Sequence, residues 1–303
     1  MGAEIAELMG EELGDPNLED FANGEIHCKF SESIRGSDVF IIQTHCQTPD
    51  SSINDAVMEQ LIMVDAAKRA SAKRITVVCP HYGYGRQDRK SRGREPITAK
   101  LVANLFKSAG ASRLVGVDLH SGQIQGFFDG PVDHLTAMPV LVDRLKGLEG
   151  EISIVSPDAG RVKVAERYAM QLGADLAIVH KRRSHTAFNT VEAKEVVGDV
   201  DGKTCVIVDD IIDSGGTIVN AVDALIKKGA KDVYVFVTHA VLSGEAINRI
   251  KKSKIKKLVI TDSINNSKRI KNINKIQVLS IAPLMAEAIK RISNSTSVSS
   301  LFN

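Results

Sequence analysis

Residues 205–217 read Cys-Val-Ile-Val-Asp-Asp-Ile-Ile-Asp-Ser-Gly-Gly-Thr, and the rest of the chain is best understood outward from this stretch. An apolar, β-branched run ends in two adjacent acids, turns through residues 213–216, and opens a helical apolar pattern at Thr217. The order strand, tight loop, helix is typical of a phosphate site, because glycines let a ligand approach the backbone and a helix N-terminus favours an anion. We therefore expect a phosphate at residues 213–217.

Three carboxylates at the rim of this loop narrow the kind of ligand. Asp209 and Asp210 are expected to end the strand, where neighbouring side chains point to opposite faces, so only one of them should face the ligand. Carboxylates repel a phosphate unless they accept hydrogen bonds from sugar hydroxyls or hold a metal. The pattern indicates a sugar phosphate site. An acidic N-cap on an ordinary strand–helix unit would explain one Asp, but not three acids beside Gly-Gly-Thr.

Composition limits the class of protein. With 303 residues, 43% of them hydrophobic, the chain can bury one large or two medium cores. A net charge of +2 argues against a nucleic-acid binder. No apolar run approaches the roughly 18 to 20 residues of a membrane span, and no signal peptide opens the sequence, so we expect a soluble protein. The four cysteines are far apart without metal-ligand spacing, which indicates thiols in a reducing cytoplasm.

The two halves of the chain share one plan. Four positions recur at a constant offset of 119 residues, the difference between 98 and 217. These pairs are Thr98 and Thr217, Gly110 and Gly229, Ala111 and Ala230, and His120 and His239. We therefore expect two similar α/β domains, residues 1–140 and 141–303, that arose by duplication. In the helix that begins at Thr98, we expect Leu101, Val102, Leu105 and Phe106 to face the core.

The stretch at residues 208–217 resembles the ribose 5-phosphate loop of the phosphoribosyltransferase superfamily, and its Asp-Asp-x-Ile-Asp form is similar to that of ribose-phosphate pyrophosphokinases. Residues 84–90 and 94–100, Tyr-Gly-Arg-Gln-Asp-Arg-Lys and Arg-Glu-Pro-Ile-Thr-Ala-Lys, resemble a pyrophosphokinase segment that transferases lack. The resemblance extends from Phe21 to Phe302. It implies an α/β fold with two phosphoribosyltransferase-like (Rossmann-like) domains, each a mainly parallel sheet flanked by helices. It also implies that residues 283–303 pack back on the first domain.

This resemblance implies formation of 5-phosphoribosyl 1-diphosphate (PRPP) and AMP from ATP and ribose 5-phosphate. Asn-Gly at residues 23–24 is by itself a hairpin turn, but it lies in a segment similar to the family's Phe-Ser-Asp-Gly-Glu, which holds adenine from a neighbouring subunit. A homo-oligomer, in this family a hexamer, is therefore expected. The basic run at residues 86–94 would otherwise be a solvated loop. The ATP-binding residues implied are Phe21, Asn23, Gly24, Glu25, Arg86, Gln87 and His120.

Magnesium is the cofactor that the resemblance implies, with His120 and Asp158 as the metal residues. A lone His at a strand end is more often structural, but residues 118–128 are similar to the family's Asp-Leu-His-x-x-Gln-Ile-Gln-Gly-Phe-Phe. Asp158 precedes Gly160-Arg161, where some relatives have Gly-Gly. Lys181 and Arg183 match the catalytic Lys-x-Arg of a flexible loop that closes over the reacting phosphates; by themselves they would belong to a solvated basic loop. The implied ribose 5-phosphate residues are Arg183, Asp209, Asp210, Asp213, Ser214, Gly215, Gly216 and Thr217.

Two other functions stay open from the sequence. A PRPP-consuming phosphoribosyltransferase would keep residues 209–217, but it has no use for the Arg86-Gln87 segment. A non-catalytic, synthetase-associated regulatory subunit would be expected to have lost Lys181, Arg183 or the acids, which are all present. The prediction is therefore a cytoplasmic enzyme that binds ATP and ribose 5-phosphate, and neither nucleic acid nor a membrane.

Overall fold

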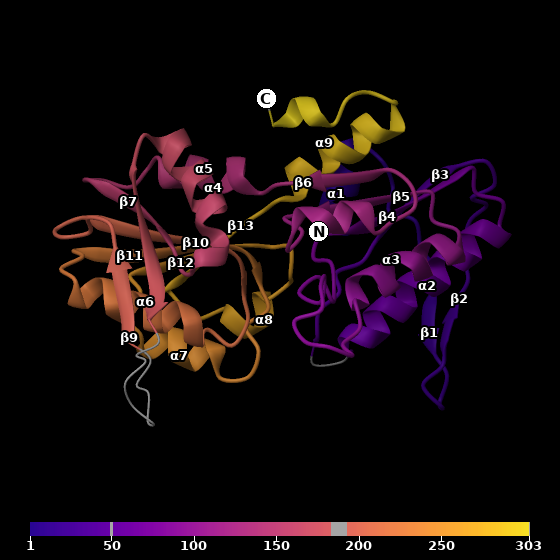
Figure 1. The fold of residues 1–303 in the computed structure, drawn as a ribbon. Coiled ribbons are helices and arrows are strands. Elements are labelled where there is room, and N and C mark those ends of the chain that lie inside the picture. Colours follow the sequence, from indigo (N-terminus) through magenta and orange to yellow (C-terminus); the bar gives the residue numbers. More distant parts are fainter. Residues whose placement is uncertain (49–50, 183–192, 303) are drawn as a thin grey trace. The chain divides into compact units, whose positions relative to one another are not determined.

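Two mainly parallel sheets organise the chain, each within its own structural unit (Figure 1). The computed structural model describes residues 1–48, 51–182 and 193–302. One unit comprises Met1–Ala137 and Ser280–Asn303, and the other comprises Met138–Leu279. Among the described residues, no helix is long and apolar enough to cross a membrane. Sheets flanked by helices in both units confirm the α/β class that the sequence predicts.

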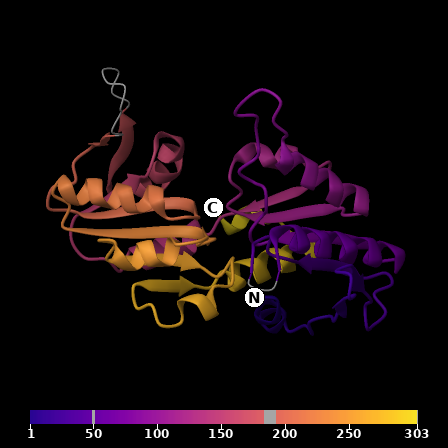
Figure 2. The same ribbon diagram turned by 90° about the horizontal axis from the view of Figure 1, so that it is seen from below.

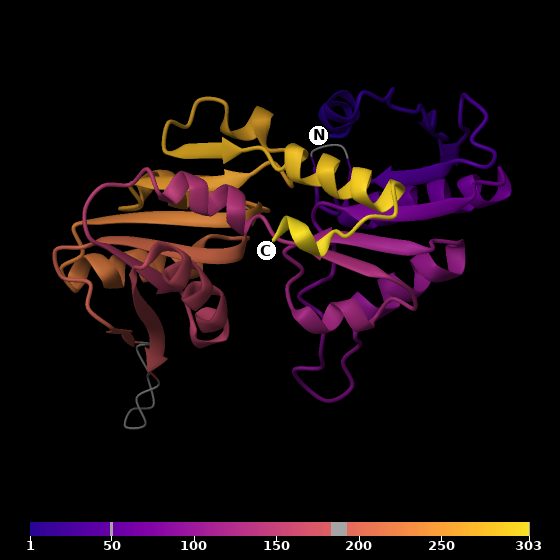
Figure 3. The same ribbon diagram turned by 90° about the horizontal axis from the view of Figure 1, so that it is seen from above.

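The first unit is built on a four-stranded parallel sheet in the order β3-β4-β5-β6, beside a small antiparallel hairpin of β1 and β2. Its elements are α1 (Gly2–Met9), β1 (Leu18–Asp20), β2 (Ile26–Cys28), β3 (Asp38–Ile42), α2 (Ile53–Arg69), β4 (Arg74–Cys79), α3 (Thr98–Ala109), β5 (Arg113–Val117), the 3-10 helix η1 (Gly122–Gly126), β6 (Val132–Leu135), α9 (Ala282–Ser293) and the 3-10 helix η3 (Ser299–Leu301). Helices α2 and α3 cover one face of the sheet, and α9 lies over the other with α1 against it (Figures 1 and 3). The central strands read as continuous apolar runs because both faces are covered.

The second unit is built on a seven-stranded sheet in the order β13-β12-β11-β10-β7-β8-β9, parallel except for β9. Its elements are α4 (Met138–Leu145), β7 (Ile152–Ser156), the 3-10 helix η2 (Ala159–Arg161), α5 (Val162–Leu172), β8 (Asp175–Arg182), β9 (Ala193–Val197), β10 (Thr204–Ile212), α6 (Gly216–Lys227), β11 (Asp232–Ala240), α7 (Ala246–Lys252), β12 (Lys257–Thr261), α8 (Ser267–Ile270) and β13 (Ile276–Leu279). Figure 1 shows α4 and α5 on one face and α6 and α7 on the other. Strands β8 and β9 form an antiparallel ribbon at one edge (Figure 2).

The predicted internal repeat has matching backbone geometry in the two units. Gly110 and Gly229 follow α3 and α6 with φ of 129° and 100°, a region that favours glycine. The next residues close the helices alike, because the Ala111 N–H donates to the Phe106 carbonyl at 3.0 Å and the Ala230 N–H donates to the Leu225 carbonyl at 3.1 Å. Each helix then leads to a buried parallel strand, β5 or β11. A strand, loop, helix, strand unit therefore occurs twice.

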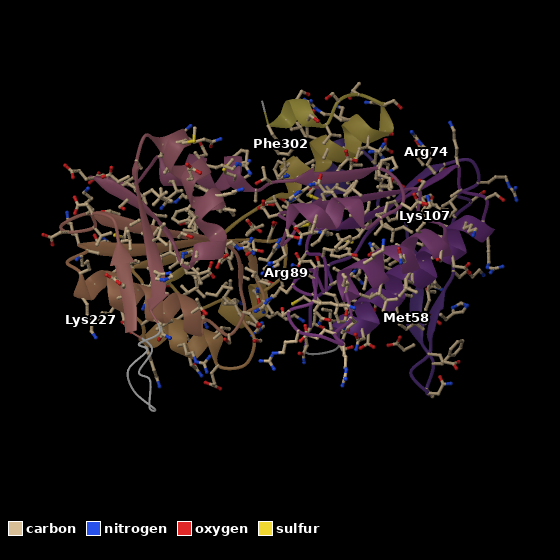
Figure 4. All side chains as sticks on the ribbon, viewed as in Figure 1. Met58, Arg74, Arg89, Lys107, Lys227 and Phe302 are labelled. Atoms are coloured by element: carbon tan, nitrogen blue, oxygen red, sulfur yellow. The ribbon has the colours of Figure 1, made fainter. Side chains whose placement is uncertain are left out.

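One expectation about the core is wrong. Leu101 and Leu105 on α3 are 54% and 42% exposed, whereas Val102 and Phe106 are buried. The helix turns toward the sheet the stripe of Ala99, Val102, Ala103 and Phe106, which recurs at three- and four-residue spacing. The two leucines lie on the neighbouring stripe, about 100° away around the helix. On the adjacent helix α2, Met58 is likewise exposed (Figure 4). Farther along α3, Lys107 Nζ lies 5.6 Å from the centre of the Phe128 ring.

Candidate active site

The loop between β10 and α6 has the geometry of an anion site. Gly215 is the N-cap residue of α6 and has φ of 75°, a left-handed conformation that side chains rarely adopt. The N-cap residue makes no side-chain cap hydrogen bond, and a glycine at the start of a helix is the usual setting for an anion site. The strand differs from expectation, because β10 runs past the two acids to Ile212. The five residues of the predicted phosphate loop, Asp213, Ser214, Gly215, Gly216 and Thr217, therefore lie from the strand end into the first turn of α6.

The site lies at the topological switch point of the second unit's sheet, where the strand order reverses. Strands β7 and β10 are parallel neighbours at the centre of the sheet. From β7 the chain continues through α5 to β8 on one side, and from β10 it continues through α6 to β11 on the other. Such a point leaves a crevice at the carboxyl ends of the two strands, the usual ligand position in open α/β sheets. The loop with Asp158 and the loop at residues 213–217 both start here.

Asp209 and Asp210 meet at a single guanidinium. Arg161 Nε lies 3.3 Å from Asp209 Oδ1, and Arg161 Nη2 lies 2.6 Å from Asp210 Oδ1. Arg161, from the loop after β7, is long enough to reach both acids, although neighbouring side chains along a strand start on opposite faces. That only one of the two acids faces the ligand stays a prediction. Burial and the neighbouring Asp210 raise the pKa of Asp209 well above its usual range, and the charge of Arg161 opposes this rise.

Asp158 and Arg161 share one short segment. The Asp158 carboxylate caps η2 by accepting the Gly160 N–H at 2.8 Å, and its side chain is exposed. The Arg161 N–H donates to the Asp158 carbonyl at 3.4 Å. Asp158 is thus held just beyond the carboxyl end of β7, with its carboxylate exposed. Arg161 was not among the predicted site residues, because no local pattern marks an ion pair between residues so far apart in the chain.

Two further residues missed by the sequence support the phosphate loop. Arg249, on α7, donates through Nη1 to the Ser214 carbonyl at 2.8 Å. The Ser243 hydroxyl donates to the Asp213 carboxylate. Both supporting residues come from the segment after β11, and neither belongs to a recognisable motif. They fix Asp213 and Ser214 of the loop from the segment that contains α7.

One of the two predicted catalytic residues, Lys181, belongs to the β8–β9 ribbon. Lys181 lies in β8, where its backbone pairs with Lys194 of β9. Arg183 lies outside the described residues. The sequence predicted a polar loop after β8 and missed β9, whose residues Ala-Lys-Glu-Val-Val carry a weak alternation. The ribbon is anchored in the same sheet as the phosphate loop.

Three of the seven predicted ATP-binding residues, Arg86, Gln87 and His120, lie on neighbouring loops of the first unit. Gln87 is fixed by the start of α3, because the Thr98 hydroxyl donates to Gln87 Oε1 at 2.6 Å and the Ala99 N–H donates to the Gln87 carbonyl at 3.2 Å. Arg86 beside it is exposed, as is Arg89 (Figure 4). Tyr84 carries a positive φ of 60°, a strained conformation for an aromatic residue.

The segment with His120 joins this loop through a hydrogen bond. Gln123 Nε2, on η1, donates to Asp88 Oδ2 at 2.6 Å. His120 is half-buried and lies beyond β5, which ends at Val117 and not at His120 as expected. Asp118 between them has φ of 40°, and its carboxylate accepts the Ala137 N–H at 3.0 Å. The turn that presents His120 is therefore held in a sparsely populated conformation.

A buried network that the sequence did not predict supports the same loop. The Gly83 N–H donates to His45 Nδ1 at 3.0 Å, and His45 Nε2 lies 2.8 Å from Gln60 Oε1. Gln60 Nε2 in turn donates to the carbonyls of Ile41 and Val78, at 2.8 and 3.2 Å. Burial lowers the pKa of His45 from 6.5 to about 4. His45 is therefore neutral and carries its proton on Nε2.

The predicted adenine segment is the tip of the β1–β2 hairpin. The Phe21 N–H donates to the Glu25 carbonyl at 2.8 Å, and Asn23 Oδ1 accepts the Glu25 N–H at 3.1 Å. Gly24 has φ of 85°, as a hairpin turn requires. The Phe21 side chain is 55% exposed, and the hairpin extends away from its own sheet (Figure 1). The hairpin reading of Asn-Gly is confirmed.

Comparison with known proteins covers the whole chain. Residues 1–110 match the sequence profile of the N-terminal domain of ribose phosphate pyrophosphokinase, and residues 190–303 match that of the phosphoribosyl synthetase-associated domain. The ribose-phosphate pyrophosphokinase of Streptomyces coelicolor is 53% identical over 305 residues, 100% of this chain and 93% of that protein. That of Bacillus caldolyticus is 53% identical over 304 residues, 100% of this chain and 94% of that protein.

A solved structure agrees with the sequence relatives. The phosphoribosylpyrophosphate synthetase from Mycobacterium smegmatis has a TM-score of 0.90 with 47% identity, covering 96% of this chain and 94% of that one. Near-complete coverage in both directions means that neither unit is an unrelated addition. The chain therefore belongs to the ribose-phosphate pyrophosphokinase family, the enzymes that make PRPP.

Proposed function

We propose that the chain makes PRPP by transferring the β,γ-diphosphoryl group of ATP to the anomeric hydroxyl of ribose 5-phosphate, with AMP as the leaving group. The observation that carries this assignment is the uncapped start of α6 beside the Asp209–Asp210 pair at the centre of the sheet. One ligand that suits a helix N-terminus and two carboxylates together is a sugar phosphate, because its phosphate needs donors and its hydroxyls need acceptors.

The ribose 5-phosphate would lie across this crevice. Its phosphate would accept hydrogen bonds from backbone N–H groups of residues 213–217 and from the Ser214 and Thr217 hydroxyls. Asp209 and Asp210 would accept hydrogen bonds from ribose hydroxyls, and they are fixed for this by Arg161. The sugar is then held at both ends, so that its anomeric hydroxyl has one position. Such positioning supplies much of the rate in phosphoryl transfer, where little covalent chemistry is required.

The nucleotide would be held by Arg86, Gln87 and His120 of the first unit. Arg86 is exposed at the loop tip and suits a phosphate, while Gln87 is held by Thr98. The hairpin residues Phe21, Asn23, Gly24 and Glu25 would serve the adenine of a neighbouring subunit, because their ring and turn extend away from their own sheet. We accordingly propose a homo-oligomer, in this family a hexamer.

Magnesium fits the donor set only as a cation shared with substrate. Within the described part of the chain, no cluster of three or more His, Cys, Asp or Glu side chains forms a metal site. Magnesium is commonly bound by one or two carboxylates together with substrate phosphates, and the exposed Asp158 suits that role, with His120 as the second residue. When bound, the ion would neutralise phosphate charge. The four cysteines are free thiols, which supports a reducing compartment such as the cytoplasm.

Lys181 and Arg183 would stabilise the charge that develops on the transferring group. Removal of one preorganised charge costs on the order of 100- to 1,000-fold in rate. We therefore expect Lys181→Ala to lose at least 100-fold, while Lys227→Ala, an exposed lysine in the last turn of α6 (Figure 4), keeps wild-type activity.

Phosphorus NMR with ribose 5-phosphate, ATP and magnesium tests both assignments. Equal amounts of AMP and PRPP from the wild type, lost in Lys181→Ala, are the expected result. Silence from the folded wild type would instead indicate the non-catalytic regulatory subunit. Consumption of added PRPP with a free purine or pyrimidine base would indicate a transferase.

A further inference from the structure

We infer that Arg161 is a positioning residue for ribose 5-phosphate, which acts by holding Asp209 and Asp210 in the one arrangement that accepts the sugar hydroxyls. This inference rests on the proposed function. Arg161 lies in the loop that follows β7, and its side chain extends to the acids on the neighbouring strand β10.

The contacts give Arg161 two carboxylates at once. Nη2 lies 2.6 Å from Asp210 Oδ1 and Nε lies 3.3 Å from Asp209 Oδ1, and the three side chains are only 16%, 10% and 14% exposed. The Asp210 N–H also donates to Asp209 Oδ1 at 2.9 Å. The Asp209 carboxylate is thus fixed from two sides, by its neighbour's backbone and by the guanidinium.

Two adjacent carboxylates in a poorly solvated place repel each other unless a cation lies between them. A guanidinium suits this task because it offers several N–H groups in a fixed plane, whereas an ammonium is a point charge. Without Arg161, the two side chains would move apart toward solvent. Each would then present its oxygens to the ribose in several orientations, and part of the binding free energy of the sugar would be spent on ordering them.

The anchorage of Arg161 ties the acid pair to the neighbouring loop. Arg161 is the last residue of η2 and precedes α5, and its N–H donates to the Asp158 carbonyl at 3.4 Å. One residue therefore links the segment proposed to meet the diphosphate with the residues proposed to meet the sugar. Loss of its side chain should disturb the sugar contacts and leave the backbone of the Asp158 segment in place.

The test compares Michaelis constants for the two substrates. We expect Arg161→Gln to raise KM for ribose 5-phosphate on the order of tenfold, as for the loss of a buried ion-pair contact, with KM for ATP within twofold of wild type. The KM of Arg161→Lys for ribose 5-phosphate should lie between those of wild type and Arg161→Gln, since lysine keeps the charge but reaches one carboxylate at a time. The matched control is Arg69→Gln, which removes an exposed guanidinium 2.6 Å from Asp65 in the first unit and should change neither constant.

A double-mutant cycle with Asp210→Asn identifies the route of the effect. If Arg161 acts through the acids, Arg161→Gln should cost at least threefold less in the Asp210→Asn background than in wild type, because contacting groups are not additive. Arg69→Gln should cost the same in both backgrounds. Full additivity would overturn the inference and indicate that Arg161 contacts the substrate itself.

Other outcomes are equally decisive. An unchanged KM for ribose 5-phosphate in folded Arg161→Gln would also overturn the inference. So would a KM for ATP that rises as much as the KM for ribose 5-phosphate in both Arg161→Gln and Arg161→Lys. If thermal unfolding shows that Arg161→Gln is not folded, Arg161→Lys alone supplies the comparison of KM for ribose 5-phosphate with KM for ATP. A wild type that makes no PRPP contradicts the proposed function instead, so the two failures are distinguishable.

Discussion

His45 links the stability of the first unit to pH. Burial lowers its pKa from 6.5 to about 4, so the unfolded chain binds a proton before the folded chain does. The free energy of unfolding therefore keeps its full His45 contribution above pH 6.5 and loses it, about 3 kcal/mol, as the pH falls toward 4. Urea unfolding of His45→Asn should show a smaller loss between pH 7 and 4.5 than wild type, because Asn does not titrate. Parallel losses in the two proteins would contradict this account.

At the same scale, the sequence predicts the residues that belong to contiguous motifs and misses their partners. Asp209, Asp210 and Asp213 are recognisable because strand, turn and helix signals surround them. Arg161, Arg249 and His45 meet their partners only after folding, at sequence separations of 48, 35 and 38 residues to Asp209, Ser214 and Gly83. A single sequence carries no local signal for such pairs.

Among the elements, α7 has a role beyond packing, because it braces the phosphate loop through Arg249. Arg249→Met keeps most of the side-chain stem and removes the donor to the Ser214 carbonyl. Because solvent screens this exposed, charged hydrogen bond, it should contribute about 1 kcal/mol to the binding of ribose 5-phosphate. Its loss then predicts a rise of about fivefold in KM for ribose 5-phosphate. Steady-state kinetics would measure it, with Lys252→Met on the same helix as the control. An equal change in both variants would mean that α7 does not brace the loop.

Element type was predictable wherever the apolar pattern was long. The apolar pattern predicts strands at residues 74–79 and 152–156, and β4 and β7 have these bounds, whereas β1, β6, β9 and α8 were not predicted. These four are three to five residues long, too short for periodicity to distinguish them from loops. The exposure of Leu101 and Leu105 has another cause: two apolar stripes adjoin on α3, and only the sheet determines which of them is buried.

At the scale of the whole molecule, the exposed hairpin predicts that active sites are shared between chains. Phe21→Ala would lack the ring proposed to contact adenine, and Lys181→Ala would lack the charge proposed to stabilise the transferring group. Each variant is expected to be nearly inactive alone. A chain with intact Lys181 can receive its hairpin from the other variant. Co-expression of the two variants should therefore restore PRPP formation, measured per milligram of purified oligomer. Activity no greater than the sum of the separate variants would mean that the hairpin serves its own chain.

The return of α9 to the first unit, where it lies against α1, has a consequence for synthesis of the protein. Because α1 is synthesised before the second unit and α9 after it, the first unit cannot be completed until the second unit has been made. The second unit is one continuous segment, Met138–Leu279, and all its strands emerge before that helix. The unit built from two separated segments is therefore completed after the unit that lies between them.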